Sequence, residues 1–170
     1  MGLYTDKISY FKNLASIDPN IACSENNNSF FDVADEDALA AAIANNVHYP
    51  FVWVEDLRGN LKSLDGGINQ NYTWSLRFYT KAEFTETDFE NEAIRKAYDD
   101  TLEILKHWQH RIINDAFNDD GSALFQNVDN GSFSFSKTEK FKDNFFGWQL
   151  QFNEVHVLNF ILPEKGYWNK

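Results

Sequence analysis

The chain has 170 residues, 43% of them hydrophobic and 16% aromatic, which is too much apolar material for a disordered chain and suits one domain rather than two. The formal net charge of −11 argues against a general nucleic-acid-binding protein and against an anionic membrane surface as partner, because each would require a basic footprint. Solubility alone accounts for the charge; the functional alternative is an acidic wall that lets DNA pass without sticking.

Cysteine content and local hydropathy bound the compartment. The single Cys23 excludes an internal disulfide framework and fits a reducing compartment or a virion. The opening MGLYTDKISYFKNLA lacks the apolar stretch of a secretory signal, and no run approaches the roughly 18–20 apolar residues of a membrane span. We therefore expect a protein that is neither secreted nor bound to a membrane.

Two helices are expected near the N-terminus. Apolar residues recur at helical spacing from Tyr4 to Ala15, and Pro19 ends the pattern. A polar, Asn-rich stretch separates this helix from a second one within DVADEDALAAAIANNV. Asp35 and Asp37 fall in the first turn of the second helix, where capping explains the paired carboxylates without any catalytic role.

Strand patterns follow. Residues Tyr49 to Glu55 form a nearly continuous apolar run, typical of a strand that is buried on both faces. The stretch DLRGNLKSLDGGINQN is polar and contains glycine, so residues 57–70 are expected to protrude as a loop or as a hairpin. From Asn71 to Phe84 the residues alternate between apolar and polar, which predicts a strand with one wetter face.

The longest predicted element is a helix from about Thr87 to Phe117, with a broad apolar stripe. About 30 residues at roughly 1.5 Å each make a rod near 45 Å, which must pack across a whole sheet or against another subunit. Glu103, His107 and His110 share one face of this helix. A metal could use that spacing, but a solvent-facing stripe explains it equally well, so we expect no metal and no cofactor.

Two further strands are expected, Gly131 to Lys137 and Asn144 to Leu158. In the second, apolar residues alternate up to Phe152 and then shift phase, which predicts a bulge at Asn153–Glu154. The tail 163–170 leaves the domain and carries two aromatic residues. These belong either to a flap docked on their own domain or to a contact with a neighbouring subunit.

Together the patterns predict one α+β domain over residues 1–170. Its mostly antiparallel sheet of about four strands is packed by one long helix and two shorter N-terminal helices. The sequence contains no nucleophile elbow of the G-x-S-x-G kind. The turn NDAFNDDG places an alanine at the first ligand position of a calcium loop, and Gly66-Gly67 is not followed by a helix, as a phosphate-binding loop would require. We therefore expect no enzymatic activity.

The order of elements and the late motif FSFSKTEKFKDNFFGWQLQFNEV, in which a charged connection leads to a glycine and an alternating aromatic strand, carry a resemblance. The chain resembles the small tail-terminator or tail-completion proteins of tailed bacteriophages and related tail-like particles. The resemblance implies a structural subunit that forms a ring at the end of the tail tube, in a virion or in the cytoplasm of a bacterial host. Its implied partners are copies of itself and tube, sheath or connector proteins, and it implies no catalytic residues.

Ring neighbours are joined through two different patches on each copy. From composition and expected exposure, the candidate interface residues lie in the protruding segment and in the tail: Leu57, Arg58, Leu61, Leu64, Tyr167 and Trp168. The alternative function is a small acidic binding or adaptor module whose surface contacts a basic protein partner, with marked dependence on salt.

Overall fold

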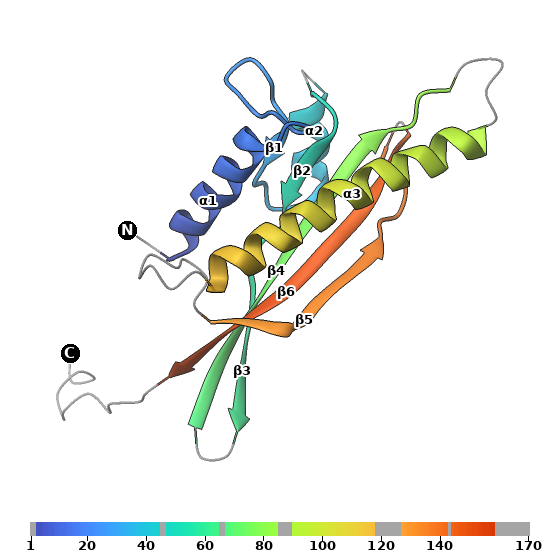
Figure 1. Ribbon diagram of the computed structural model, residues 1–170. Helices are drawn as coiled ribbons and strands as arrows, with labels where there is room; N and C mark the ends of the chain where they lie inside the picture. The colour runs from blue at the N-terminus through green and yellow to red at the C-terminus, as the bar shows by residue number, and fades with distance from the viewer. Residues whose placement is uncertain are drawn as a thin grey trace.

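The structure is a computed structural model that describes residues 3–44, 47–64, 67–84, 90–117, 127–142 and 144–158. Within these ranges the chain is α+β, with three helices and a mixed sheet of six strands (Figure 1). The helices are α1 (Leu3–Ile17), α2 (Glu36–Ile43) and α3 (Glu90–Phe117). The strands are β1 (Phe30–Phe31), β2 (Phe51–Val54), β3 (Arg58–Leu64), β4 (Gly67–Lys81), β5 (Val128–Lys137) and β6 (Phe145–Leu158).

The three predicted helices are confirmed. The Asp35 carboxylate caps α2 by accepting a hydrogen bond from the Ala38 backbone N–H at 2.8 Å, as its position suggested. The 28 residues of α3 correspond to a rod of about 42 Å. The predicted start of that helix at Thr87 lies outside the described residues. None of the described helices combines the length and apolar character needed to cross a membrane.

The sheet has the strand order β1-β2-β4-β6-β5, and β3 pairs with β4 away from that path. Pairing is antiparallel except between β1 and β2, so the prediction of a mostly antiparallel sheet is confirmed. The central strand β4 pairs with β6 along one edge. On its other edge it pairs with β2 from Leu76 to Tyr79 and with β3 from Gly67 to Thr73.

The number of strands was underestimated, because six are present and about four were expected. The two-residue β1 is too short to show a periodic pattern, and it forms by pairing in parallel with β2. Strand β3 has the sequence RGNLKSL, which lacks a continuous apolar face. Residues 57–70 therefore form a hairpin rather than a loop, with Arg58 opposite Thr73 and Leu64 opposite Gly67.

The predicted bulge at Asn153–Glu154 is wrong. The pairing of β6 with β4 keeps one register from Ile68 opposite Leu158 to Lys81 opposite Phe145. The irregularity lies instead on β5, where the register with β6 shifts between Asp129 and Ser134. The apolar pattern appeared to shift because Glu154 occupies a buried position that the alternation assigns to an apolar residue.

Helices cover the two faces of the sheet unequally (Figure 1). Helices α1 and α3 cover one face through the main core, which includes Phe11, Trp74, Phe78, Trp108 and Phe152. The short α2 packs on the other face through a smaller cluster. That cluster contains Phe31, Leu39, Ala40, Ile43, Phe51, Trp53, Tyr79, Phe141 and Phe145. Because β2 contributes to both clusters, its predicted burial on both faces is confirmed.

Candidate interaction surfaces

Polar side chains replace the apolar cluster along the rest of the face that α2 covers. Alternating residues of β4 and β6 point to this face, because Tyr79 and Phe145 of the same two strands pack beneath α2. The residues of this polar sheet face are Glu55, Thr73, Ser75, Arg77, Ser134, Ser136, Gln149, Gln151 and Asn153. Hydroxyl and amide groups dominate it, so it can exchange many hydrogen bonds with a partner.

One hydrogen-bonded network organises this face. Gln149 Nε2 donates to Glu55 Oε2 at 2.9 Å and to Ser75 Oγ at 2.7 Å. The Ser75 hydroxyl donates to the same Glu55 oxygen. Arg77 Nη2 lies 2.7 Å from the other Glu55 oxygen, and Arg77 Nη1 lies 2.9 Å from Glu36 Oε1 at the start of α2. The network therefore ties α2 to three strands.

The electrostatics of the network favour structure over chemistry. Burial alone would lower the pKa of Arg77, but the hydroxyl of Tyr79 and the carboxylates of Glu55 and Glu36 together raise it, so the guanidinium stays charged. Its plane lies over the ring of Trp53, 5.0 Å from the centroid. Both Glu55 oxygens are occupied, one by Arg77 and the other by Ser75 and Gln149, so the carboxylate serves to join the strands.

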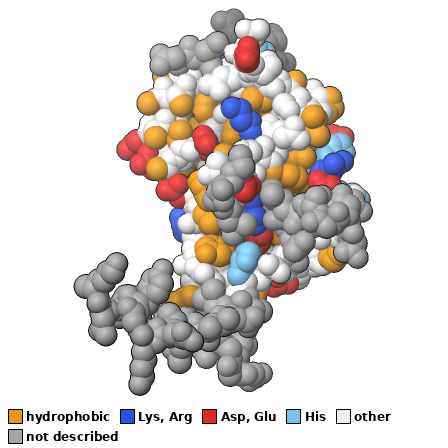
Figure 2. Space-filling model, turned by 90° about the vertical axis from the view of Figure 1, so that its left-hand side faces the viewer, with side chains coloured by type: hydrophobic (Ala, Val, Ile, Leu, Met, Phe, Trp, Pro, Cys, Tyr) orange, Lys and Arg blue, Asp and Glu red, His pale blue; other side chains and the backbone are white. Residues whose placement is uncertain are grey.

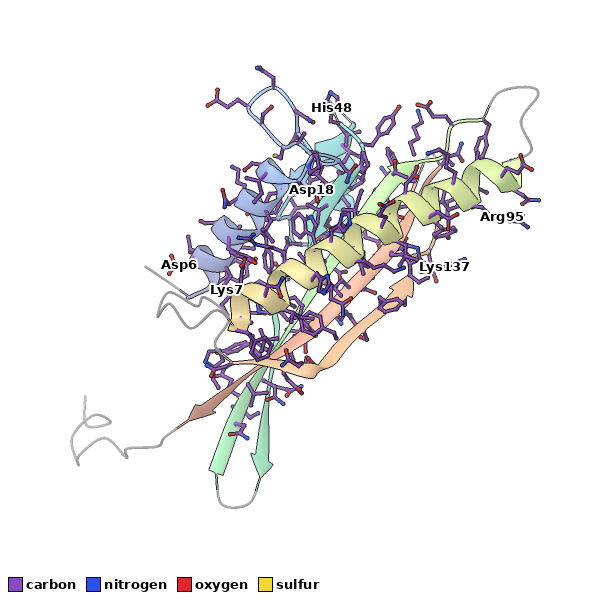
Figure 3. The ribbon with its side chains drawn as sticks, viewed as in Figure 1. Asp6, Lys7, Asp18, His48, Arg95 and Lys137 are labelled. Atoms are coloured by element: carbon purple, nitrogen blue, oxygen red, sulfur yellow. The ribbon has the colours of Figure 1, made fainter. Side chains whose placement is uncertain are left out.

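A buried ion pair joins α1 to the opposite face of the sheet. The ammonium of Lys7 contacts Glu154 Oε1, and Trp74 Nε1 donates to Glu154 Oε2 at 2.7 Å. Burial lowers the pKa of Lys7, and Glu154 partly offsets that effect. Figure 3 shows Lys7 on the side of α1 that faces the sheet and the neighbouring Asp6 on the outer side. With both charges neutralised in the core, this pair fixes how α1 sits on the sheet.

The predicted interface residues fall in different environments. Leu57 is half-buried and packs against the main core, whereas Arg58 is exposed on β3. Leu61 is 64% exposed on the same strand. Leu64 ends β3, but its side chain is outside the described residues, and so are Tyr167 and Trp168. Arg58 and Leu61 therefore both lie exposed on β3, three residues apart and so on opposite faces of the strand.

The histidine stripe lies on the surface. Glu103, His107 and His110 are all exposed on α3. Across the part of the chain that the structure describes, no three His, Cys, Asp or Glu side chains are grouped closely enough to hold a metal ion.

A row of three hollows follows one side of α3. Their volumes are about 400, 310 and 160 Å³, in order from the N-terminal end of the helix. One wall runs along α3 from Ala93 to Arg111, and the other is built by segments 14–20, 49–50 and 80–83. The first and second hollows share Asp100, and the second and third are lined by successive turns of α3. We call this row the α3 groove.

The hollows of the α3 groove differ in chemistry. Asp100 and Glu103 line the central hollow together with Asn20, Pro50 and Ile104, and Asp100 is already paired with Lys96 from the neighbouring hollow, so Glu103 is the carboxylate without a described ion-pair partner. The third hollow is lined largely by apolar side chains, Leu14, Ile17, Pro19 and Trp108, with Asp18, His107 and Arg111 around them. Asp18, labelled in Figure 3, accepts a hydrogen bond from Trp108 Nε1 at 2.9 Å and so joins the two walls.

No family model matches the chain, and no curated protein matches it in sequence. The surfaces must therefore be interpreted from their own geometry. Sequence reasoning missed both the polar network and the α3 groove, because each joins residues that lie far apart along the chain. The one available signal was the run of polar residues at alternate positions of β4 and β6.

Proposed function

We propose that this chain is a structural subunit that assembles with copies of itself into a ring at the end of a phage tail or tail-like tube. The observation that carries the proposal is the β3–β4 hairpin, which extends beyond the helices together with the end of β6 (Figure 1). Only β4 pairs with β3 among the described strands, so the outer edge of β3 is open. An open strand edge with an exposed leucine suits contact with another subunit.

Two further features support an assembly subunit. The polar sheet face offers hydrogen-bonding groups over several strands, and the side chains around Glu55 and Arg77 bond to one another and join α2 to the sheet. The sequence pattern resembles tail-terminator and tail-completion proteins, whose subunits act through their surfaces. A net charge of −11 further suits a ring through which DNA passes.

Sedimentation and negative-stain microscopy test the proposal. The purified chain, alone or with tube fragments, should form rings or stacked discs. Leu61→Asp should weaken this assembly because it places a charge on the projecting strand. Phe117→Asp is the matched control, because Phe117 is exposed to a similar degree (60%, against 64% for Leu61) at the end of α3. A monomer that binds no tube and forms no ring would refute the proposal, and neighbouring genes for tube, sheath or portal proteins would support it.

A second candidate, an acidic module that binds a basic protein, is favoured by a cluster of exposed acidic residues. Asp32, Asp35, Glu36 and Asp37 lie at and before the start of α2, and all are exposed. Figure 2 shows acidic side chains gathered along the left-hand margin of the molecule. This function would give discrete small complexes whose affinity falls steeply with salt, rather than rings.

A further inference from the structure

We propose that the α3 groove of one copy binds residues 162–168 (LPEKGYW) of a second copy. In this arrangement Lys165 occupies the central hollow, and Trp168 occupies the third hollow. The inference rests on the self-assembly proposed above and names the contact that would join neighbouring copies.

The chemistry of the segment complements that of the groove. The central hollow presents the exposed carboxylate of Glu103 beside the Asp100–Lys96 ion pair, and a lysine ammonium is a suitable counterion for Glu103. The third hollow presents apolar side chains, among them Ile17, which is 60% exposed, and the ring of Trp108. Aromatic side chains are favoured in such hollows because they bury a large apolar area.

The spacing also agrees. Along α3, the residues that line the central hollow (100–104) and those that line the third (107–111) are centred about six residues apart, or roughly 9 Å of helix. With three residues per turn and a rise of about 3.1 Å, a polyproline-II segment would point Lys165 and Trp168 to the same side, roughly 9 Å apart. A cation and an aromatic side chain would therefore meet the two hollows when the segment runs alongside α3 in the same direction.

The segment cannot occupy both hollows on its own copy. Trp108, in the third hollow, has its ring centroid 5.2 Å from that of Phe78, which pairs with Trp148. Leu158 is ten residues further along β6, roughly 33 Å away. Lys165 lies seven residues beyond Leu158 and reaches at most about 25 Å. The central hollow is therefore out of reach, and the occupant must come from another molecule.

Photo-crosslinking of the full chain tests the contact. The variant carries p-benzoylphenylalanine in place of Trp168, and equal amounts of light and ¹⁵N-labelled protein are mixed before irradiation. We expect crosslinks between light and heavy molecules that map to residues 14–19 or 107–111. Crosslinks confined to one molecule, crosslinks to other surfaces, or no crosslink at all would overturn the inference.

Charge reversal tests the central hollow independently. Glu103→Lys should weaken self-association about tenfold, and so should Lys165→Glu, because each places like charges together. The double variant should recover most of the lost affinity. The matched control is Asp99→Lys, which makes the same charge change at an exposed site on α3 outside the groove lining. Equal weakening by Glu103→Lys and Asp99→Lys would contradict a specific contact.

The outcomes separate this contact from the ring itself. Rings whose crosslinks avoid the α3 groove would retain the proposed function and refute this inference. Crosslinks to the groove in a dimer, without rings, would support the inference and refute the ring. Binding of an unrelated basic protein to the groove, with no self-association, would refute both.

Discussion

Replacing Lys7 with methionine should destabilise the fold strongly, although methionine matches lysine in length and is apolar. Lys7 is fully buried, and the Glu154 side chain is 2% exposed. The substitution leaves the Glu154 carboxylate buried without its ammonium, while Trp74 Nε1 still donates to it at 2.7 Å. Removing one partner of a buried ion pair costs about 3–5 kcal/mol. Because one strong donor remains, we expect the lower end, about 3 kcal/mol.

The double variant Lys7→Met/Glu154→Gln separates charge from packing. It removes both charges and keeps an oxygen that accepts from Trp74. Its stability should lie within about 1 kcal/mol of the native protein, because replacing both members of a buried pair is often neutral. Urea unfolding followed by tryptophan fluorescence measures the difference. With a slope of about 2 kcal/mol per molar urea, the single variant should lose about 1.5 M in its midpoint.

Salt dependence provides a second measurement on the same variant. The variant leaves the Glu154 carboxylate without the ammonium that contacts its Oε1, so added salt should change the stability of the variant little, because the lost contact is buried and poorly screened. A single variant as stable as the native protein at pH 7, or a double variant as unstable as the single one, would refute this reasoning.

Three further predictions concern stability. Tyr10→Phe should cost about 1 kcal/mol at pH 7, because the Tyr10 hydroxyl donates to Asp115 at 2.8 Å. Burial raises the pKa of Tyr10, so its unfolded form ionises first, and the variant should lose less stability above pH 10 than the native protein. Urea unfolding at several pH values measures both effects. Gly147→Ala should cost about 3 kcal/mol or more in thermal unfolding, because the Cβ of the new alanine would lie 1.7 Å from the Phe78 carbonyl oxygen on β4. The control Gly131→Ala should be nearly neutral, because the nearest atom to its Cβ would be 3.4 Å away. Arg77→Lys should cost about 1 kcal/mol in urea unfolding, because lysine cannot bridge two carboxylates while lying flat on a tryptophan ring.

The sequence predicted the elements whose periodicity reflects burial. The apolar stripe of α3 and the doubly buried run of β2 were predictable because each residue's environment repeats at a fixed spacing. The partners with which each strand or buried charge pairs could not be predicted in this way. β1 exists only because β2 lies beside it, and Glu154 breaks the alternation because Lys7, 147 residues away, neutralises it. The local sequence pattern contains no information about such a distant partner.

The candidate surfaces were harder to predict for the same reason. Arg58 and Leu61 could be proposed as exposed from their polar surroundings, and both are exposed on β3. The network of Glu55, Ser75 and Gln149 arises only when three strands align in register. The α3 groove requires segments before β1, around β2 and after β4 to lie beside one helix.

The continuous pairing of β4 with β6 has a mechanical consequence. The same two strands run without a register break from beneath α3 to the hairpin, so the projection and the body share one ladder rather than a hinge. A force applied to the hairpin by a neighbouring molecule would therefore act along the paired strands on the part of the sheet that α1 and α3 cover.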